Sequence, residues 1–432
     1  MTSWRKMSLR DAGVMLIDCV HATPPAKARG YPYVAIPQMK NGRIDFESAR
    51  RISQSDFTEW TKKARPQLHD VVLSRRTNPG VTATFDDQVE FALGQNLVLL
   101  RADGTHVLPE FLRWLVTGPF WWEQIEKFNN VGAIFDSLRC ADVPRFELPI
   151  PPKPTQHAIA SVLKALDDKI VINRSMCTTL EATVQSIYKD WFIDFGPVRA
   201  KSLGGNSYLT GSVWSLFANS FDESGLPLGW ATSSIGQEVE VFGGSTPSTK
   251  EVKYWGGDIA WATPKDLSSL STPVLLSTER QITELGLSQI SSGLLPTGTV
   301  LLSSRAPIGY LAITDVPVAV NQGFIAMVCK GRLSNVFVWQ WVQASLEQVH
   351  RRANGSTFQE ISKANFRPIT VTVGTPEIHV AFDALVKPMF ERISANEREI
   401  RALATTRDFL LPRLMSGEIT VKDAEKSVGE LT

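Results

Sequence analysis

The sequence has few of the residues and none of the long apolar runs that mark several common protein classes. Its four cysteines, Cys19, Cys140, Cys177 and Cys329, include no C-x-x-C pair. This excludes a disulfide scaffold, predicts no metal site and fits a reducing cytoplasm. No stretch approaches the roughly 18 consecutive apolar residues that span a bilayer. The first residues also lack an apolar run of signal-peptide length, so we expect a cytoplasmic protein with no membrane contact.

An excess of positive charge is also missing. The 45 lysines and arginines almost balance 44 acidic residues, which leaves a net charge of +1. A protein that binds nucleic acid alone usually has a clear basic excess, because neutralising phosphates supplies much of the affinity. The 432 residues and 43% hydrophobic content are nevertheless enough for about two to four ordinary globular domains.

Motifs for catalysis and cofactor binding are absent too. The six histidines are scattered without an H-E-x-x-H pair, and the chain contains no G-x-x-x-x-G-K-[ST] loop. No G-x-G-x-x-G follows a strand-like run, and no G-x-S-x-G elbow occurs. The sequence therefore predicts that this chain is not an enzyme and binds no cofactor itself.

An internal repeat is the main positive feature. Ile170, Asn173 and Leu180 fall on Ile393, Asn396 and Leu403 at a constant offset of 223 residues. Further upstream the match continues with small drifts. Pro37 resembles Pro264 and Gln95 resembles Gln322. Solenoid units recur every 20 to 50 residues or so, so a repeat of this length indicates a duplicated domain.

Each half ends in a helical stripe whose apolar positions alternate in steps of four and three. A period of 3.5 residues keeps one seam facing a partner helix, so we expect the two helices to pair as a coiled coil. A single Asn interrupts each stripe at the same place, which would fix the register. A long amphipathic helix packed on its own domain is the alternative. The predicted core positions are Ile159, Leu163, Leu166, Ile170, Asn173, Leu180, Val184, Ile187, Phe382, Val386, Met389, Ile393, Asn396, Ile400, Leu403 and Leu410.

The segments before the helices contain short apolar runs bounded by turn residues. Residues 71–73, 96–100, 299–302 and 324–328 are of this kind and predict strands. We therefore expect an α/β (α+β) protein with two mixed, β-rich domains, each followed by a long helix. The expected boundaries are 1–150 and 227–374 for the domains, 151–197 and 375–418 for the helices, 198–226 for a Gly- and Ser-rich linker and 419–432 for a tail.

Basic and polar side chains in the two β-rich segments are the candidates for contacting nucleic acid. Arginine and lysine serve both phosphate contact and guanine readout, and Ser, Thr and Asn contact bases or phosphates. Each one is individually more often a solvent-facing group. The candidates are Lys40, Arg43, Arg50, Arg51, Arg65, Arg75, Arg76, Asn78, Ser245, Thr246, Ser248, Thr249, Lys250, Lys253, Tyr254, Lys265 and Arg305.

Several stretches together resemble the specificity subunit of type I restriction-modification enzymes. Leu226-Pro-Leu-Gly-Trp230 and Phe242-Gly-Gly-Ser-Thr-Pro-Ser-Thr-Lys250 look like the start of that family's target recognition domain. Ser304-Arg-Ala-Pro-Ile-Gly309 looks like its later part, and Arg407-Asp-Phe-Leu-Leu-Pro412 like its terminal helix. The first half departs from the pattern, because Cys19-Val-His-Ala-Thr-Pro24 stands where the second has Gly243-Gly-Ser-Thr-Pro247.

The resemblance implies a non-catalytic subunit with a pseudo-twofold repeat, in which two target recognition domains sit on an antiparallel coiled-coil spacer. Each domain would read one half of a split, asymmetric site in double-stranded DNA. Expected partners are two modification (methyltransferase) subunits and restriction (translocase/nuclease) subunits, which would bring S-adenosylmethionine, ATP and Mg. The implied role is DNA methylation and defence against foreign DNA.

Two other classes remain as alternatives. A coiled-coil scaffolding protein with protein-binding globular domains fits the near-neutral charge. It would show no DNA binding that depends on salt. A self-contained methyltransferase or nuclease would need a cofactor loop or an acidic metal cluster, and the sequence offers neither.

Overall fold

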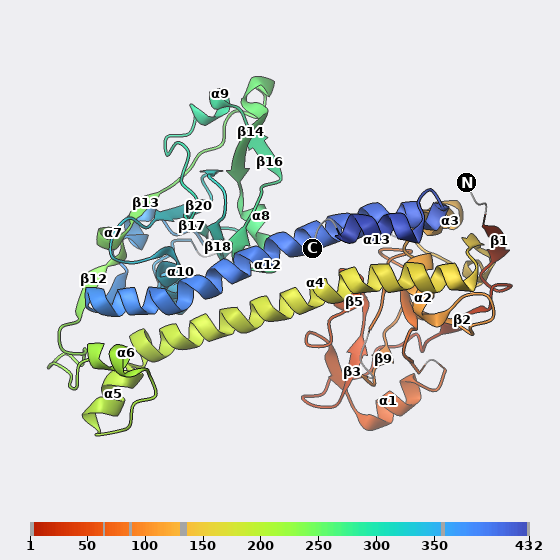
Figure 1. Cartoon of the computed structure of the whole chain (residues 1–432), viewed down its shortest axis with the longest axis horizontal. Helices are drawn as coiled ribbons and strands as arrows, with labels where there is room; N and C mark the ends of the chain where they lie inside the picture. The colour runs from red at the N-terminus through yellow and green to blue at the C-terminus, as the bar shows by residue number, and fades with distance from the viewer. Residues whose placement is uncertain (1–3, 64, 86–88, 130–135, 356–358, 430–432) are drawn as a thin grey trace. The chain divides into compact units, whose positions relative to one another are not determined.

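The computed structural model describes residues 4–63, 65–85, 89–129, 136–355 and 359–429 (Figure 1). The chain divides into two compact units. Unit 1 comprises Met1–Lys169 and Ala402–Thr432, and unit 2 comprises Ile170–Arg401. Both boundaries fall inside long helices, α4 (Lys153–Tyr188) and α12 (Pro376–Ser416). Each unit is described by itself.

Unit 1 is a mixed domain of short strands and helices. Its elements before α4 are β1 (Arg5–Ser8), β2 (Val14–Asp18), β3 (Tyr31–Val34), η1 (Ile36–Gln38), β4 (Met39–Lys40), β5 (Arg43–Ile44), β6 (Arg50–Ile52), α1 (Gln54–Trp60), β7 (Val71–Ser74), β8 (Thr82–Ala83), β9 (Ala92–Leu93), β10 (Leu97–Ala102), α2 (Pro109–Leu115), α3 (Pro119–Phe128), η2 (Val143–Arg145) and β11 (Glu147–Ile150). A four-stranded sheet has the order β2-β10-β7-β8, a three-stranded sheet the order β6-β3-β9, and two-stranded sheets join β1 to β11 and β4 to β5.

Unit 2 repeats this architecture with longer strands. Its elements between α4 and α12 are η3 (Lys189–Ile193), α5 (Gly196–Ser202), α6 (Gly211–Leu216), β12 (Ala231–Ser234), α7 (Ile235–Glu238), β13 (Glu240–Phe242), η4 (Val252–Tyr254), β14 (Trp255–Ala262), α8 (Pro264–Ser268), β15 (Val274–Leu275), β16 (Arg280–Ile282), α9 (Glu284–Leu287), β17 (Val300–Ser304), β18 (Ile308–Thr314), β19 (Ala319–Val320), β20 (Phe324–Val328), α10 (Asn335–Arg351), α11 (Lys363–Phe366) and β21 (Thr370–Val373). The expected strands at residues 71–73, 96–100, 299–302 and 324–328 are confirmed as β7, β10, β17 and β20.

The sheet orders of the two units correspond strand by strand. The five-stranded order β13-β20-β17-β18-β15 matches β2-β10-β7-β8 with one extra edge strand, and β16-β14-β19 matches β6-β3-β9. In each three-stranded sheet one pair is antiparallel and the other parallel. The duplication and the mixed α/β class expected from the sequence are therefore confirmed.

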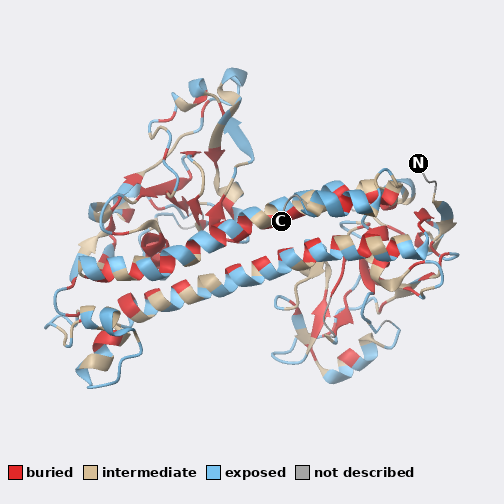
Figure 2. Cartoon of the chain, in the orientation of Figure 1, coloured by how far each residue is buried: buried red, intermediate tan, exposed pale blue. Residues whose placement is uncertain are grey.

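The long helices each bury one face, visible as a broken red stripe in Figure 2. Within unit 2, Cys177 Sγ lies 3.9 Å from the carbonyl oxygen of Ile393. The rings of Tyr188 and Phe382 are 6.2 Å apart. The two helices therefore run antiparallel in this unit, since residue numbers rise along one helix as they fall along the other. In unit 1, Arg407 of α12 donates to Asp167 of α4 at 2.7 Å.

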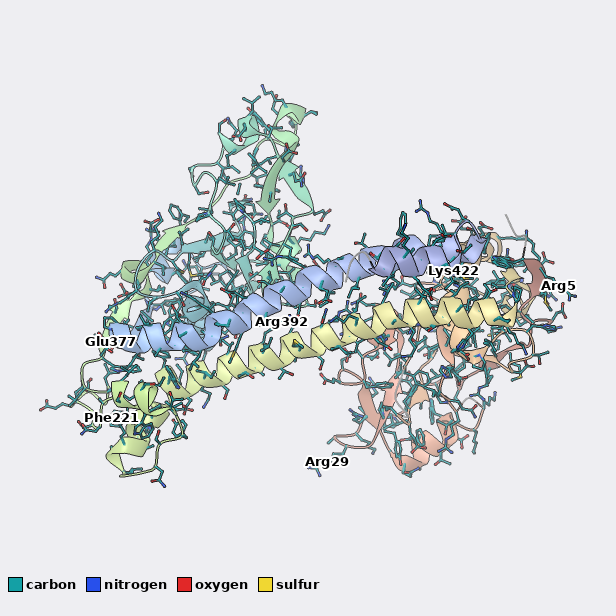
Figure 3. All side chains as sticks on the ribbon, in the orientation of Figure 1. Arg5, Arg29, Phe221, Glu377, Arg392 and Lys422 are labelled. Carbon is teal, nitrogen blue, oxygen red and sulfur yellow. The ribbon has the colours of Figure 1, made fainter. Side chains whose placement is uncertain are left out.

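The segment expected as a linker, residues 198–226, contains most of α5 and all of α6. Val198 and Phe217 are buried in the core of unit 2. Phe221, labelled in Figure 3, packs edge-on against Phe195 at 6.2 Å. At the C-terminus, α13 (Val421–Gly429) begins at a Thr420 cap and buries Ala424. Among the described residues, no helix is long and apolar enough to cross a membrane.

Candidate nucleic-acid interface

In unit 2, the loop 243–250 that follows β13 can only be built with glycine at its start. A Cβ placed on Gly244 would lie 1.7 Å from the carbonyl oxygen of Val320, which no side chain tolerates. The close approach lets Ser245 N–H donate to that same oxygen at 3.1 Å. The loop is thereby attached to β19, and the second glycine of the Gly-Gly pair in the sequence motif has a steric cause.

Side chains from neighbouring elements fix the rest of this loop. Thr246 Oγ1 donates to Gln322 Oε1 at 2.6 Å. Trp261 Nε1 donates to the Ser245 carbonyl at 3.3 Å, and Trp255 Nε1 donates to the Ser248 carbonyl at 3.1 Å. These bonds leave four exposed side chains on an anchored backbone: Thr246, Ser248, Thr249 and Lys250.

In unit 1, a hollow of about 640 Å³ lies at the corresponding place. Apolar and polar groups both line it, and the lining residues include Thr23, Pro37, Arg50, Thr77, Gln95 and Asn96. Arg50 Nη1 donates to the Pro24 carbonyl at 3.3 Å, which holds the guanidinium beside the loop. Hydrogen-bonding groups on a concave surface suit base edges or a phosphate.

The same three residue types lie near one another in both units, and we call this arrangement the Thr–Pro–Gln corner. In unit 1, Thr23, Pro37 and Gln95 line one hollow. In unit 2 their repeat partners are Thr246, Pro264 and Gln322. Thr246 bonds Gln322 directly, and Pro264 Cγ lies 3.0 Å from where a Cβ on the adjacent Gly323 would be. Residues that are far apart in sequence thus converge twice.

Many of the predicted cationic candidates are paired with carboxylates. The pairs are Lys40–Asp45 (2.7 Å), Arg43–Asp167 (4.0 Å), Arg65–Glu90, Lys253–Glu251 (3.5 Å), Lys265–Glu279 (2.8 Å) and Arg305–Glu360 (3.7 Å). Hydrogen bonds from Lys40 hold the pKa of Asp45 at about 2, and Glu279 raises the pKa of Lys265. Exposed ion pairs of this kind contribute at most ~1 kcal/mol to folding stability, so the cation can leave its carboxylate for a phosphate. Arg43 differs, because Asp167 is buried.

The remaining predicted candidates divide by exposure. Arg50, Arg51 and Lys250 have no carboxylate partner among the described residues, and Arg50 and Lys250 are exposed. Arg75 points inward: it donates to the Leu138 carbonyl at 3.5 Å and its Nε is buried. Arg76 and Asn78 are exposed on the loop after β7, where Asn78 N–H donates to the Arg76 carbonyl at 2.7 Å. Tyr254 is half-buried at the end of η4.

Arg280, at the start of β16, is an exposed cation that the sequence reasoning missed. Its guanidinium carbon lies 3.4 Å from the centre of the Trp255 ring and 5.5 Å from that of Trp261. The two indoles meet edge to face at 5.0 Å. Within the described part of the chain no carboxylate pairs with Arg280. Stacking holds the cation flat and leaves its N–H groups available.

The predicted helix-core positions are inward-facing. Leu180, Ile187 and Met389 are half-buried, and the other thirteen are buried: Ile159, Leu163, Leu166, Ile170, Asn173, Val184, Phe382, Val386, Ile393, Asn396, Ile400, Leu403 and Leu410. Asn173 and Asn396 are fully buried. The Asn173 amide has no hydrogen-bond partner among the described residues, and Asn396 has only the weakly bonding Cys177 thiol beside it. Such amides cost stability, which fits a role in register.

A family model described as the type I restriction modification DNA specificity domain matches residues 21–182 and 227–379. This chain belongs to that family. The two matched segments follow the internal repeat, each containing one Thr–Pro–Gln corner and part or all of the β-rich segment around it. The specificity-subunit identity expected from the sequence motifs is confirmed, and with it the non-catalytic class.

Individual relatives agree with this family. The chain is 37% identical over 166 residues to the type I restriction enzyme MjaIX specificity subunit of Methanocaldococcus jannaschii, an alignment that spans 38% of each protein. It is 24% identical to the HindI specificity subunit of Haemophilus influenzae, over 77% of this chain and 82% of that protein. A crystal structure of the type I S subunit from M. genitalium shares the fold with a TM-score of 0.57 and 16% identity, covering 96% and 99% of the two chains.

Proposed function

We propose that this specificity subunit recognises a bipartite, asymmetric site in double-stranded DNA, with one half-site read by each β-rich domain. The proposed target recognition domains are residues 1–150 and 227–374. The observation that carries the proposal is the double occurrence of the Thr–Pro–Gln corner, formed in each unit by segments that connect the strands of matching sheets. The groups around the corners differ: Arg50 and Asn96 stand at the first, and Lys250 is on the loop of the second. Two domains of the same fold that expose different side chains can read two different half-sites.

The two long helices would set the spacing between the half-sites. We propose that residues 151–197 and 375–418 form an antiparallel coiled-coil spacer. Antiparallel contact between α4 and α12 in unit 2 and the Arg407–Asp167 pair in unit 1 support this. Two readers on a stiff spacer define the half-site separation geometrically.

The contact residues we propose are those that are both exposed and held in place. Arg50 serves the first half-site, and Lys250 and Arg280 serve the second, with Thr246, Ser248 and Thr249 as neutral donors. Exposed paired cations, such as Lys265, would exchange their carboxylates for phosphates. Arg43 and Arg75 have inward-facing partners and are assigned to structure instead.

Partner subunits would supply the chemistry. We propose two modification subunits, which bring S-adenosylmethionine, and restriction subunits, which bring ATP and Mg, acting on DNA in the cytoplasm. An apolar exposed strip on α4 supports a docking role: the relative exposure is 37% for Val171, 56% for Ile172 and 36% for Met176. Partners that share the phosphate contacts would also explain the net charge of +1.

The test is to map methylated bases in DNA from cells that express the full chain with a candidate modification subunit. We expect a split motif with a fixed gap that appears only when both proteins are present. Replacing Arg50 with Ala should alter recognition of one half-site, and replacing Arg280 with Ala should alter the other. A scaffold would instead show no motif and no salt-dependent binding to duplex DNA, and that result would refute the proposal.

A further inference from the structure

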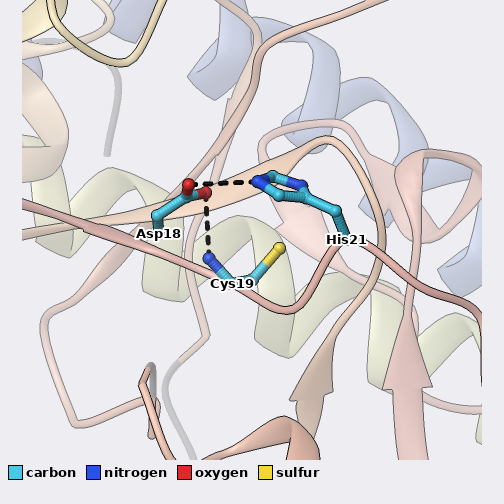
Figure 4. A group of neighbouring side chains, drawn as sticks. All are labelled: Asp18, Cys19 and His21. Atoms are coloured by element: carbon cyan, nitrogen blue, oxygen red, sulfur yellow. Dashed lines mark hydrogen bonds and ion pairs between the residues drawn. The ribbon is translucent and has the colours of Figure 1, made fainter.

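Unit 1 contains a cluster of metal-ligand side chains at the end of β2. Asp18 is the last residue of β2, and Cys19 and His21 follow it on the loop toward Thr23. One ligand atom from each of these three residues lies within 4.8 Å of the other two (Figure 4). Asp18 Oδ2 lies 3.0 Å from His21 Nε2, while Asp18 Oδ1 accepts from Cys19 N–H at 3.0 Å.

A second cysteine comes to this place from the far end of the domain. Cys140 is half-buried, and burial, followed by the nearby Asp18 carboxylate, raises the pKa of its thiol. The segment that leads to Cys140 is held by the backbone, because Leu138 N–H donates to the Arg75 carbonyl at 2.9 Å and Arg75 N–H donates to the Asn96 carbonyl at 3.0 Å. We call Asp18, Cys19, His21 and Cys140 the Asp18 cluster.

The charges around the cluster suit a divalent cation bound by thiolates. Two thiolates and one carboxylate around a dication leave one net negative charge. Burial raises the pKa of both thiols, to about 11 for Cys19, and the nearby Arg75 guanidinium opposes part of this rise. The buried Nε of Arg75 has no hydrogen-bond partner among the described residues. Arg75 can therefore offset that charge from outside the ligand set.

The internal repeat supplies an independent comparison. The partner of Cys140 in unit 2 is Lys363, and the loop that corresponds to Cys19–Thr23 contains Gly243 and Gly244. Lys363 Nζ lies 3.1 Å from where a Cβ on Gly243 would be. In unit 2 an ammonium group therefore lies beside the start of the loop 243–250. Unit 1 has the Cys140 thiol at that position in place of a lysine.

We propose that the Asp18 cluster binds one structural Zn²⁺ ion. Thiolate, imidazole and carboxylate are the ligand types that zinc takes, at about 2.3 Å for sulfur and about 2.0–2.2 Å for nitrogen and oxygen. Ligand atoms around one tetrahedral zinc are roughly 3.3–3.8 Å apart, so the ligand atoms of Asp18, Cys19 and His21 reach this spacing with movements of about 1 Å. Zn²⁺ replaces the two thiol protons, which pass to solvent, and Cys19 gives up its 3.3 Å bond to the Gly94 carbonyl.

The bound ion would stabilise the connection between β2 and the hollow of unit 1 that Thr23 and Arg50 line. Thr23 lines that hollow, and Arg50 is bonded to the adjacent Pro24 carbonyl. The site concerns the chain's own structure, so it stands or falls independently of the DNA-recognition proposal.

The test uses the full-length chain purified without chelators or added metal, with metal content measured by mass spectrometry. We expect about one zinc per chain. After the metal is removed, titration with Co²⁺ should produce visible bands of a tetrahedral site and thiolate charge-transfer absorption. Replacing Cys19 or Cys140 with Ser should each weaken Co²⁺ binding by more than the roughly 10–100-fold that loss of an outer-sphere partner costs.

Two further variants keep the result interpretable. His21→Ala changes an exposed side chain and should weaken binding without unfolding the domain, which circular dichroism checks. Cys329→Ser alters a half-buried thiol of unit 2 and should leave binding unchanged. Metal below one equivalent, or Co²⁺ affinity that is the same in the Cys140→Ser and Cys329→Ser variants, would mean an adventitious ion only and would overturn the proposal.

Discussion

Arg407 of α12 donates to Asp167 of α4 at 2.7 Å, although the two residues are 240 positions apart in sequence. Asp167 is buried and also pairs with Arg113 of α2, while Arg43 of β5 approaches it at 4.0 Å. Both long helices and the β-rich part of unit 1 therefore share one carboxylate. A buried carboxylate needs such partners, because burying an unpaired charge costs several kcal/mol.

Replacing Asp167 with Asn should destabilise unit 1 by about 3 kcal/mol, since it leaves the Arg113 and Arg407 guanidinium groups without their shared charge. Urea unfolding, followed by far-ultraviolet circular dichroism, measures the loss. The matched control is Asp168→Asn. Asp168 makes an exposed ion pair with Lys164 that contributes about 0.5 kcal/mol or less. Equal effects of the two substitutions would contradict the central role of Asp167.

The sequence could predict features that depend on local periodicity or on the repeat. The 3.5-residue stripe identifies buried positions such as Leu163 and Val386, because one helix face is fixed by spacing alone. The repeat likewise predicts that Gln95 and Gln322 occupy equivalent places. The repeat does not predict that each of these glutamines lies near a Thr and a Pro, because the Thr–Pro–Gln corner forms only when strands far apart in the sequence pair.

The features that the sequence missed depend on contacts between distant segments. Nothing near Arg280 indicates stacking, which requires β16 to lie against β14. Cys19 and Cys140 are too far apart to suggest a shared site. Lys265 reads as a free cation until Glu279 is placed beside it. The Gly- and Ser-rich composition of residues 198–226 likewise gives no sign that Phe217 is buried.

Glu181 predicts a pH dependence of the stability of unit 2. Burial, and then the nearby carboxylate of Glu397, raise its pKa from 4.5 to about 7. The folded protein therefore binds more protons than the unfolded chain between pH 4.5 and 7, so its stability falls as pH rises through this window. With a discount for partial exposure, the effect is about 1–2 kcal/mol.

The variant Glu181→Gln should remove this contribution and be more stable than the parent at pH 8. Urea unfolding at several pH values between 4 and 8 tests the prediction. Exposed Glu391→Gln is the control and should keep the parent's profile. An unchanged slope in the Glu181→Gln variant would show that another group dominates.

Replacing Asn173 or Asn396 with an apolar residue should increase the stability of the protein. The Asn173 amide has no partner among the described residues and Asn396 has only the Cys177 thiol beside it, so replacing either with Leu should stabilise the protein by about 1–2 kcal/mol. The exposed Asn219→Leu should change it by less than about 0.5 kcal/mol. Denaturant unfolding measures all three. Destabilisation by the core substitutions would indicate that the amides are hydrogen-bonded in solution.

Gly244 predicts a recognition defect with a steric cause. A Cβ there would meet the Val320 carbonyl at 1.7 Å, so Gly244→Ala must push the loop away from β19. We expect at least about a tenfold loss of affinity for the cognate duplex, while the remainder of unit 2 stays folded. Gly211→Ala is the control, because nothing lies within 4 Å of its added methyl group. Fluorescence anisotropy with the mapped site compares them, and equal affinities would remove this loop from the interface.

Arg280 predicts how the second half-site is contacted. If its stacked guanidinium reads a guanine, Arg280→Ala should cost about 1–3 kcal/mol of affinity at one base pair, and Arg280→Lys should recover little, because lysine offers no planar pair of donors. If it contacts phosphate instead, Lys should restore most of the affinity, and the loss in the Ala variant should be the same for all sequences.

Fluorescence anisotropy on duplexes changed one base pair at a time separates these outcomes. Arg332→Ala is the matched control, since Arg332 is bonded to Glu238 at 2.7 Å and that pair should not contact DNA. Equal affinity of the Arg280 and Arg332 variants would exclude Arg280 and the Trp255 ring on which it stacks from the interface.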